Sequence, residues 1–294
     1  MSVIPCIQGY GLPNVNLGFT NILDGGPIRP YPGVYWQQYS IFYHTHKFLN
    51  FEGKPLGGVP SPAFNSWTAV TQLIYQFKKK LFFEGTPGFS FVLPITLYSA
   101  IKPNALGVTD AGGGIGNLGI GVYTQWGAVM HKDRQLFIHR LSVDASVPSG
   151  TNRLPKRQIN PGEAFFSLGM SWSATLYATE NLAFSWRLNY LWSSKNRKID
   201  FKPGDVVFLD YSMEYPVIPQ WYVAVAGYYL QQLSHNKAAG IIIPHSKERV
   251  IGLGPGSAYF FSKDLIFFTY LYGELGVRNR PQGVSFALRL VKHF

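Results

Sequence analysis

Seven charged side chains occupy positions where strands of alternating polarity would turn them toward an enclosed interior. They are Arg140, Asp144, Arg187, Asp210, Glu214, Glu248 and Arg289. Guanidinium groups bind anions and carboxylates, and carboxylates bind cations, so an interior carrying both signs can pair its charges or select ions. Both interpretations stay open: structural pairing that fills a narrow interior, or the lining of a permeation path.

Three other groupings lack a part that their chemistry needs. His44 and His46 would share one face of a strand, but two ligands do not make a zinc site. The glycine-rich residues 112–116 lack the following helix and the Lys-Ser/Thr pair of a phosphate loop. The sequence has no Gly-x-Ser-x-Gly elbow of a serine hydrolase. We therefore expect no enzyme activity, no metal site and no other cofactor.

The composition favours a membrane environment without transmembrane helices. Of the 294 residues, 46% are hydrophobic, 16% aromatic and only 14% charged, whereas soluble domains carry about 25% charged residues. No apolar run reaches the roughly 18 residues that a transmembrane helix needs. Mean hydropathy is nevertheless only +0.02. A transmembrane β-barrel explains both observations, because its lipid-facing and lumen-facing residues alternate.

Alternation of large apolar and small polar residues recurs along most of the chain. In residues 181–193, one face carries Leu182, Phe184, Trp186, Leu188, Tyr190 and Trp192. Period two predicts strands, with lipid on the apolar side and a wet interior on the other. The same pattern places Tyr98 and Tyr123 toward the lumen. We predict an all-β transmembrane antiparallel barrel of about twelve strands, near 34–47, 64–77, 88–100, 117–126, 135–147, 164–176, 182–194, 206–215, 221–231, 248–260, 265–273 and 283–294.

The chain divides into an irregular N-terminal segment, 1–32, and the barrel, 33–294. The segment is rich in Pro, Gly and Asn, and we expect it to contact the lumen or the periplasmic mouth, as a plug would. Residues 1–10 lack the charged start and long apolar core of a signal peptide. Since a barrel in the bacterial outer membrane must first cross the inner membrane, we expect that a leader has been removed.

The predicted connections alternate between long and short, which is typical of outer loops and periplasmic turns. The net charge is +11, and much of it falls in the long connections. We therefore expect lipopolysaccharide, rather than nucleic acid, as the anionic partner. The basic candidates for lipopolysaccharide contact or for the outer mouth are Arg153, Lys156, Arg157, Arg197, Lys198, Arg278 and Arg280.

The last strand ends in an aromatic residue, Phe294, after Phe286, Leu288 and Leu290 on one face. This ending is similar to the assembly signal of bacterial outer-membrane barrels, so the barrel-assembly machinery is an expected partner during biogenesis.

Several short motifs lie between and within the predicted strands. They are Pro32-Gly33-Val34-Tyr35, Gly116-Asn117-Leu118-Gly119, Pro148-Ser149-Gly150, Asn189-Tyr190 with Asn196, Gly204-Asp205, Asp210-Tyr211, Gly227-Tyr228-Tyr229 with Gln231-Gln232, Leu253-Gly254-Pro255 and Gly276-Val277-Arg278-Asn279-Arg280-Pro281. Together they resemble one family of outer-membrane channels, labelled as proteins of the meta-pathway of phenol degradation. The resemblance implies a narrow barrel channel with small aromatic or apolar compounds as cargo. Asn117 occupies a position where this pattern leads us to expect Asp.

The sequence thus favours a channel for passive uptake of small molecules across the outer membrane. The alternatives are a structural or binding barrel without transport, and a lipid-modifying enzyme. Strand spacing predicts that Arg187 lies opposite Glu214. The inward arginines and acids nearly cancel, so we expect a near-neutral lumen below a basic mouth and a mild anion preference that salt screens.

Overall fold

The structure is a computed structural model and describes residues 15–26, 31–56, 63–81, 83–102, 109–110, 112–153, 158–196 and 198–294. No helix among these residues is long and apolar enough to cross a membrane.

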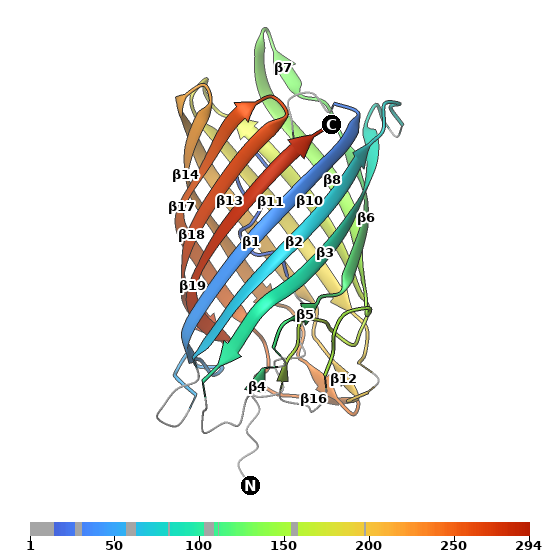
Figure 1. Cartoon of the computed structure of the whole chain (residues 1–294), viewed down its shortest axis with the longest axis vertical. Coiled ribbons are helices and arrows are strands. Elements are labelled where there is room, and N and C mark those ends of the chain that lie inside the picture. The colour runs from blue at the N-terminus through green and yellow to red at the C-terminus, as the bar shows by residue number, and fades with distance from the viewer. Residues whose placement is uncertain are drawn as a thin grey trace.

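Twelve long strands form one closed antiparallel barrel, as predicted (Figure 1). Consecutive strands pair with one another, and the circle closes because β19 pairs with β1. The strands are β1 (Gly33–Phe48), β2 (Phe64–Gln76), β3 (Thr86–Ile101), β6 (Leu118–Gln125), β8 (Arg134–Val147), β10 (Ser167–Tyr177), β11 (Ala183–Ser193), β13 (Val206–Ile218), β14 (Trp221–Gln232), β17 (Arg249–Ser262), β18 (Leu265–Arg278) and β19 (Pro281–His293).

The connections at the two ends of the barrel differ. Those at the end opposite the C-terminus are mostly long, and they contain five of the shorter strands (Figure 1). These are β4 (Thr109–Asp110), β9 (Gln158–Ile159), β12 (Phe201–Lys202), β15 (Lys237–Ala238) and β16 (Ile241–Ile242). We call this end the outer end, by the rule that outer loops are the longer ones. Another short strand, β5 (Gly114–Ile115), pairs with β3.

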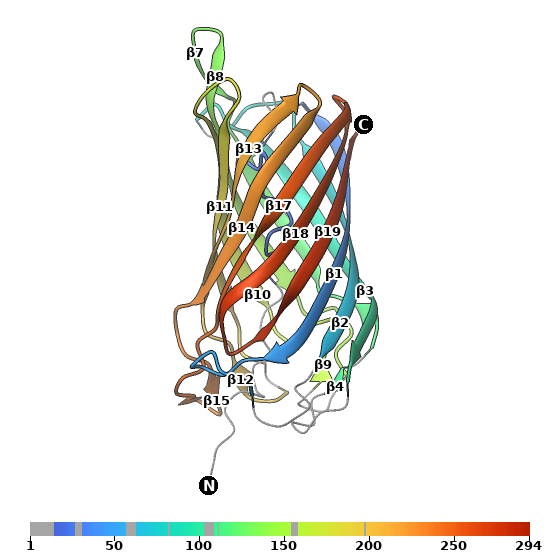
Figure 2. The same ribbon diagram turned by 90° about the vertical axis from the view of Figure 1, so that its left-hand side faces the viewer.

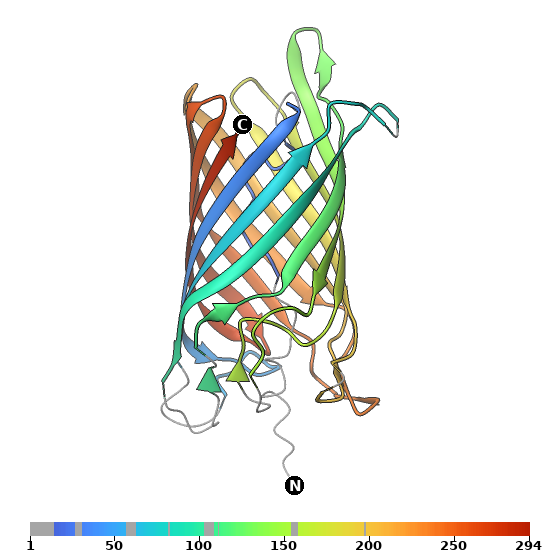
Figure 3. The ribbon, with the colours of Figure 1, turned by 45° about the vertical axis from the view of Figure 1, so that its right-hand side comes forward.

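Two connections depart from the predicted alternation of lengths. Only residues 279–280 separate β18 from β19 at the outer end, because both strands run further than the sequence pattern indicated. At the other end, β7 (Val129–His131) pairs with the start of β8 and forms a hairpin that projects past the rim (Figure 3).

The two faces of each strand follow the predicted alternation. Along β11, Ala183, Ser185 and Asn189 are buried inward, whereas Phe184 and Leu188 are exposed outward. The exposed face carries apolar and aromatic side chains around the barrel, which suits contact with lipid hydrocarbon.

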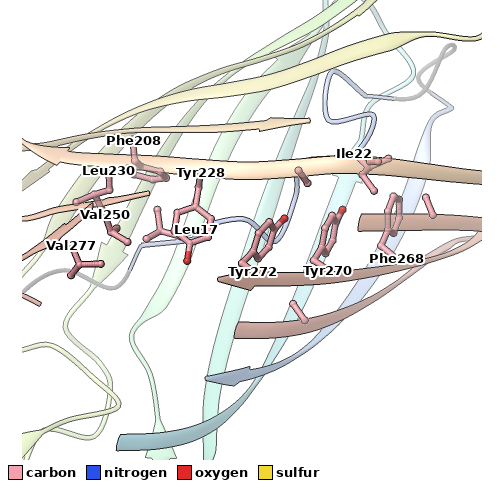
Figure 4. Packing of buried hydrophobic residues seen from close by; sticks show 14 of the residues in the cluster. Leu17, Ile22, Phe208, Tyr228, Leu230, Val250, Phe268, Tyr270, Tyr272 and Val277 are labelled. Atoms are coloured by element: carbon pink, nitrogen blue, oxygen red, sulfur yellow. The ribbon is translucent and has the colours of Figure 1, made fainter. Parts of the chain in front are cut away.

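The hydrophobic core lies inside the barrel, between its wall and residues 15–26. These residues form the blue trace that runs within the barrel (Figure 2). Leu17 and Ile22 pack against side chains that β13, β14, β17 and β18 turn inward, as Figure 4 shows. The wall residues of this cluster include Phe208, Tyr228, Leu230, Val250, Phe268, Tyr270, Tyr272 and Val277.

The outward face sets a first prediction. Val225 lies outward on β14, with 51% of its surface exposed, between the buried Ala224 and Ala226. We expect Val225→Arg to lower the free energy of unfolding from lipid bilayers by about 2–4 kcal/mol, because a charge there faces hydrocarbon. Ser66→Arg, on the cavity side of β2, is the control and should cost less. Urea-dependent refolding into vesicles measures both; equal costs would contradict the assignment of the faces.

Candidate functional site

Backbone groups of residues 15–26 are held by side chains of the barrel wall. Gly18 N donates to Asp210 Oδ1 at 2.7 Å, and Leu23 N donates to Glu214 Oε1 at 3.1 Å. Gly25 N donates to Thr175 Oγ1 at 2.9 Å. Two buried wall carboxylates therefore act as acceptors for the backbone of the segment, which satisfies groups that burial would otherwise leave unpaired.

The segment also brings its own charge into the lumen. Asp24 accepts two hydrogen bonds from Arg187, at 2.6 Å from Nε and 2.7 Å from Nη2. Arg140 Nη2 lies 3.8 Å from the same carboxylate. The Asp24 side chain is only 3% exposed. A bidentate pair of this kind is strong and directional, so it fixes the segment between β8 and β11.

Glycine lets the segment approach the wall closely. Gly18 has a φ of +80°, and a Cβ there would lie 2.7 Å from the Tyr272 ring and 2.8 Å from the Tyr228 ring. The Tyr272 hydroxyl donates to Gly18 O at 2.6 Å. A side chain at position 18 would break this contact.

The predicted pairing of Arg187 with Glu214 is wrong. Glu214 lies opposite Ala183, and Arg187 lies opposite Asp210. Alternation fixes the face of a residue but not the offset between strands, which the intervening loop sets. Arg187 finds its partner in Asp24, the only acidic residue among the first 32. Asp24 is followed by two glycines, and this single acid was the signal in the sequence that could have identified the partner of Arg187.

A cavity of about 540 Å³ remains beside the segment. The segment contributes Phe19 and Thr20, and β1, β2, β3, β6, β8, β10 and β11 contribute most of the opposite wall. Hydroxyl and amide side chains alternate there with apolar ones. They include Gln37, Gln72, Ser66, Thr68, Ser90, Ser142, Ser171 and Asn189, together with Ile41, Val70, Ile74, Val92 and Pro94.

The charged residues of the lumen divide into two groups. Arg140, Arg187, Arg289 and Asp144 line the cavity, and so does Glu163, from the β8–β10 connection. Asp210 and Glu214 are fully buried and bind the backbone of the segment instead. Glu248 lies 3.6 Å from Arg280. Of the acids expected to offset the inward arginines, Asp144 lines the cavity and Asp210 lies opposite Arg187, whereas Glu214 and Glu248 have partners elsewhere.

The two predicted lumen tyrosines have different positions. Tyr123 lines the cavity and donates a hydrogen bond to Gln76 Oε1 at 2.8 Å. Tyr98, placed toward the lumen by its sequence pattern, lies on the outer face with 53% of its surface exposed. A β-bulge leaves Leu97 without a partner on β2, so that Tyr98 pairs with Trp67. The extra residue turns every later side chain of β3 to the opposite face.

The predicted basic mouth is only partly described. Arg153, Lys198 and Arg278 are exposed at the outer end. Arg280 instead turns inward, with a side chain only 18% exposed beside Glu248, so it does not face lipopolysaccharide. Lys156, Arg157 and Arg197 lie outside the described residues.

Asn117 holds the β8–β10 connection at the outer mouth. Its buried Oδ1 accepts hydrogen bonds from Gly150 N and Glu163 N, both at 3.1 Å. An aspartate, which the family pattern led us to expect, could accept the same two bonds. Ile159, Asn160 and Pro161 of this connection reach the cavity. Asn117 therefore helps to define the outer wall of the cavity.

Within the described residues, no three histidine, cysteine, aspartate or glutamate side chains are grouped closely enough to hold a metal ion.

The fold defines the class: a twelve-stranded barrel of the kind found in bacterial outer membranes. The chain belongs to the family described as "Putative MetA-pathway of phenol degradation", which matches residues 53–290.

Solved structures with the same fold are distant in sequence. The COG4313 outer membrane channel from Pseudomonas putida F1 is 17% identical, with a TM-score of 0.78, over 90% of this chain and 97% of that one. The transport unit of the autotransporter AIDA-I from Escherichia coli is 9% identical, with a TM-score of 0.50, over 89% of this chain and 90% of that one. No curated protein sequence gives a significant match.

The ion pair at Asp24 sets a second prediction. Removing one partner of a buried pair costs about 3–5 kcal/mol, so Asp24→Asn should release the segment. Thr20, buried beside the cavity, reports on release when changed to Cys in a chain whose single cysteine, Cys6, is Ser. Since about 1.4 kcal/mol corresponds to a factor of ten, we expect maleimide to label Cys at position 20 at least about a hundredfold faster with Asp24→Asn.

The matched control is Asp200→Asn, which removes an exposed ion pair with Lys195 and should leave labelling unchanged. Equal labelling rates in both variants would show that Asp24 does not hold the segment.

Proposed function

We propose that this protein is a channel of the bacterial outer membrane that lets small molecules enter by passive diffusion. The observation that carries the proposal is the cavity beside the N-terminal segment, which apolar and polar side chains line together. Its lining extends from Asn117 and Pro161 at the outer mouth to Arg289 near the opposite end of β19. Membership of the phenol-degradation family and the shared fold with the Pseudomonas putida channel support it.

The cavity indicates small cargo of mixed polarity. Its volume of about 540 Å³ lies within the roughly 300–1,000 Å³ typical of sites for small organic molecules. Its hydroxyl and amide groups can replace water around a polar substituent, while Val70, Ile74 and Pro94 offer apolar contact. We propose that apolar or aromatic compounds bearing a polar group are the preferred cargo.

Residues 15–26 act in this proposal as a plug that narrows the lumen. They pack against the β13–β18 side, and the cavity lies mainly on the opposite side. The described residues of the segment contact the wall through hydrophobic packing, hydrogen bonds with side chains and the ion pairs of Asp24. Because none of these contacts is strand pairing, the segment can leave without opening the barrel wall.

The same packing supports the second candidate, a structural barrel that does not transport. A segment fixed by a buried ion pair fills part of the lumen in either case. Conductance separates the two functions, because a closed structural barrel carries no current.

Two membrane partners complete the proposal. Arg153, Lys198 and Arg278 are exposed at the outer end, where lipopolysaccharide phosphates would meet them. The terminal Phe294 is 71% exposed beyond β19, as a signal read by the barrel-assembly machinery would be.

A planar bilayer tests the channel directly. We expect purified protein to give steady current steps in symmetrical salt, because hydrated salt ions are small enough to pass through a path that admits small organic molecules. Folding is verified beforehand by the β-sheet signal in circular dichroism. Silence at every voltage from folded, inserted protein would refute the channel and favour the structural barrel.

The plug is tested by deletion of residues 2–25. Removing the segment widens the lumen, so we expect a severalfold rise in conductance over the intact chain. The control is Asp200→Asn, which alters an outer loop and leaves the lumen intact. If conductance and uptake are both unchanged in the deletion variant, the segment does not narrow the lumen.

A further inference from the structure

Two arginines of the cavity, Arg140 and Arg289, keep hydrogen-bond donors that no acceptor among the described residues uses. Arg187 is bound by Asp24, but Arg289 donates only its Nε, to Gln37 Oε1 at 3.0 Å. Among the described residues, no carboxylate lies within 4.0 Å of Arg289. Arg140 lies 3.8 Å from Asp24, beyond hydrogen-bond distance, and its Nε is buried without an acceptor.

Aromatic rings fix the positions of both guanidinium groups. The guanidinium of Arg289 lies 4.7 Å from the centroid of the Phe268 ring and 5.5 Å from that of Tyr39. That of Arg140 lies 5.4 Å from the centroid of Tyr123. Stacking stabilises a cation and orders it before any ligand arrives, which reduces the entropy lost on binding.

The two arginines belong to one site. Both line the same cavity, and the charge of Arg140 is repelled by those of Arg187 and Arg289. Among the described residues, one carboxylate, that of Asp24, lies within 4.0 Å of these three guanidinium groups. Asp144 and Asp210 act on them only from a longer distance, so positive charge predominates next to the guanidinium groups. An anion would relieve the repulsion and accept the unused donors.

The surroundings limit the anion to a single charge. Asp144 and Glu163 line the cavity closer to its outer end and would repel a multiply charged ligand. A planar guanidinium matches the two oxygens of a carboxylate. Beside it, Tyr39 and its strand partner Val70 line the cavity, with Ile74 further along β2, and together they can contact a flat apolar body.

We propose that Arg289 and Arg140 form a binding site for a small organic monocarboxylate with an aromatic or similarly apolar body. The role of this monocarboxylate as cargo rests on the proposed channel. Its binding to the two arginines does not depend on transport. It also moves the source of anion preference from the outer loops into the barrel.

The probes are benzoate and benzamide, which have nearly the same shape and differ in charge. Calorimetric titration of the folded full-length protein measures binding without requiring transport. We expect benzoate to bind at least about tenfold more tightly than benzamide, and Arg289→Gln or Arg140→Gln each to weaken benzoate about tenfold or more, since hydrogen bonds between charged groups are strong. Arg134→Gln, an exposed change on the same strand as Arg140, should leave binding unchanged.

Each other outcome overturns the proposal. Equal affinity for benzoate and benzamide would exclude a charge-specific site, and inorganic phosphate binding as tightly as benzoate would exclude the aromatic monocarboxylate. Loss of benzoate binding in Arg134→Gln as well would assign the effect to net charge. Conductance without benzoate binding would refute this site and leave the channel standing, whereas benzoate binding in a silent barrel would refute the channel alone.

Discussion

The structure depends on one constraint: in hydrocarbon, no backbone N–H or C=O can be left without a hydrogen-bond partner. Strands satisfy this only by closing into a barrel, which β1 and β19 achieve here by pairing along their lengths. Closure gives every strand a lipid face and a lumen face. Because a charge facing lipid costs about 2–4 kcal/mol at the midplane, the charged residues of the strands collect inside.

The charged residues inside the barrel need hydrogen-bond partners or counter-charges, and the N-terminal segment supplies them. Asp210 and Glu214 are fully buried on β13, where an ionised carboxylate without partners would be costly. The backbone N–H groups of Gly18 and Leu23 supply partners, and Asp24 supplies a counter-charge for Arg187. The segment and the wall therefore supply each other with hydrogen-bond partners and counter-charges. The structure of the lumen depends on residues 15–26, and theirs depends on the lumen.

The same division shapes the space that remains. One side of the lumen is packed with apolar side chains and acids that are already bound, and the other keeps hydroxyls, amides and arginines around a cavity. Arg140 and Arg289 stay on the open side beside aromatic rings, and among the described residues neither donates a hydrogen bond to a carboxylate. We propose that an interior that pairs some charges and leaves others open gives a stable barrel whose path discriminates between solutes.

Much of this protein was determined by its sequence alone. Alternation predicted the strands, their number and their faces, since a period of two is a local property of each segment. Local pattern also placed Arg140, Arg187 and Arg289 inside. Three features depended on tertiary structure: the offset that puts Arg187 opposite Asp210, the bulge at Leu97 that turns Tyr98 outward, and the contact between Asp24 and Arg187, 163 residues apart. Each is set by loop geometry or by packing between distant segments. The alternation within a single strand carries no information about either.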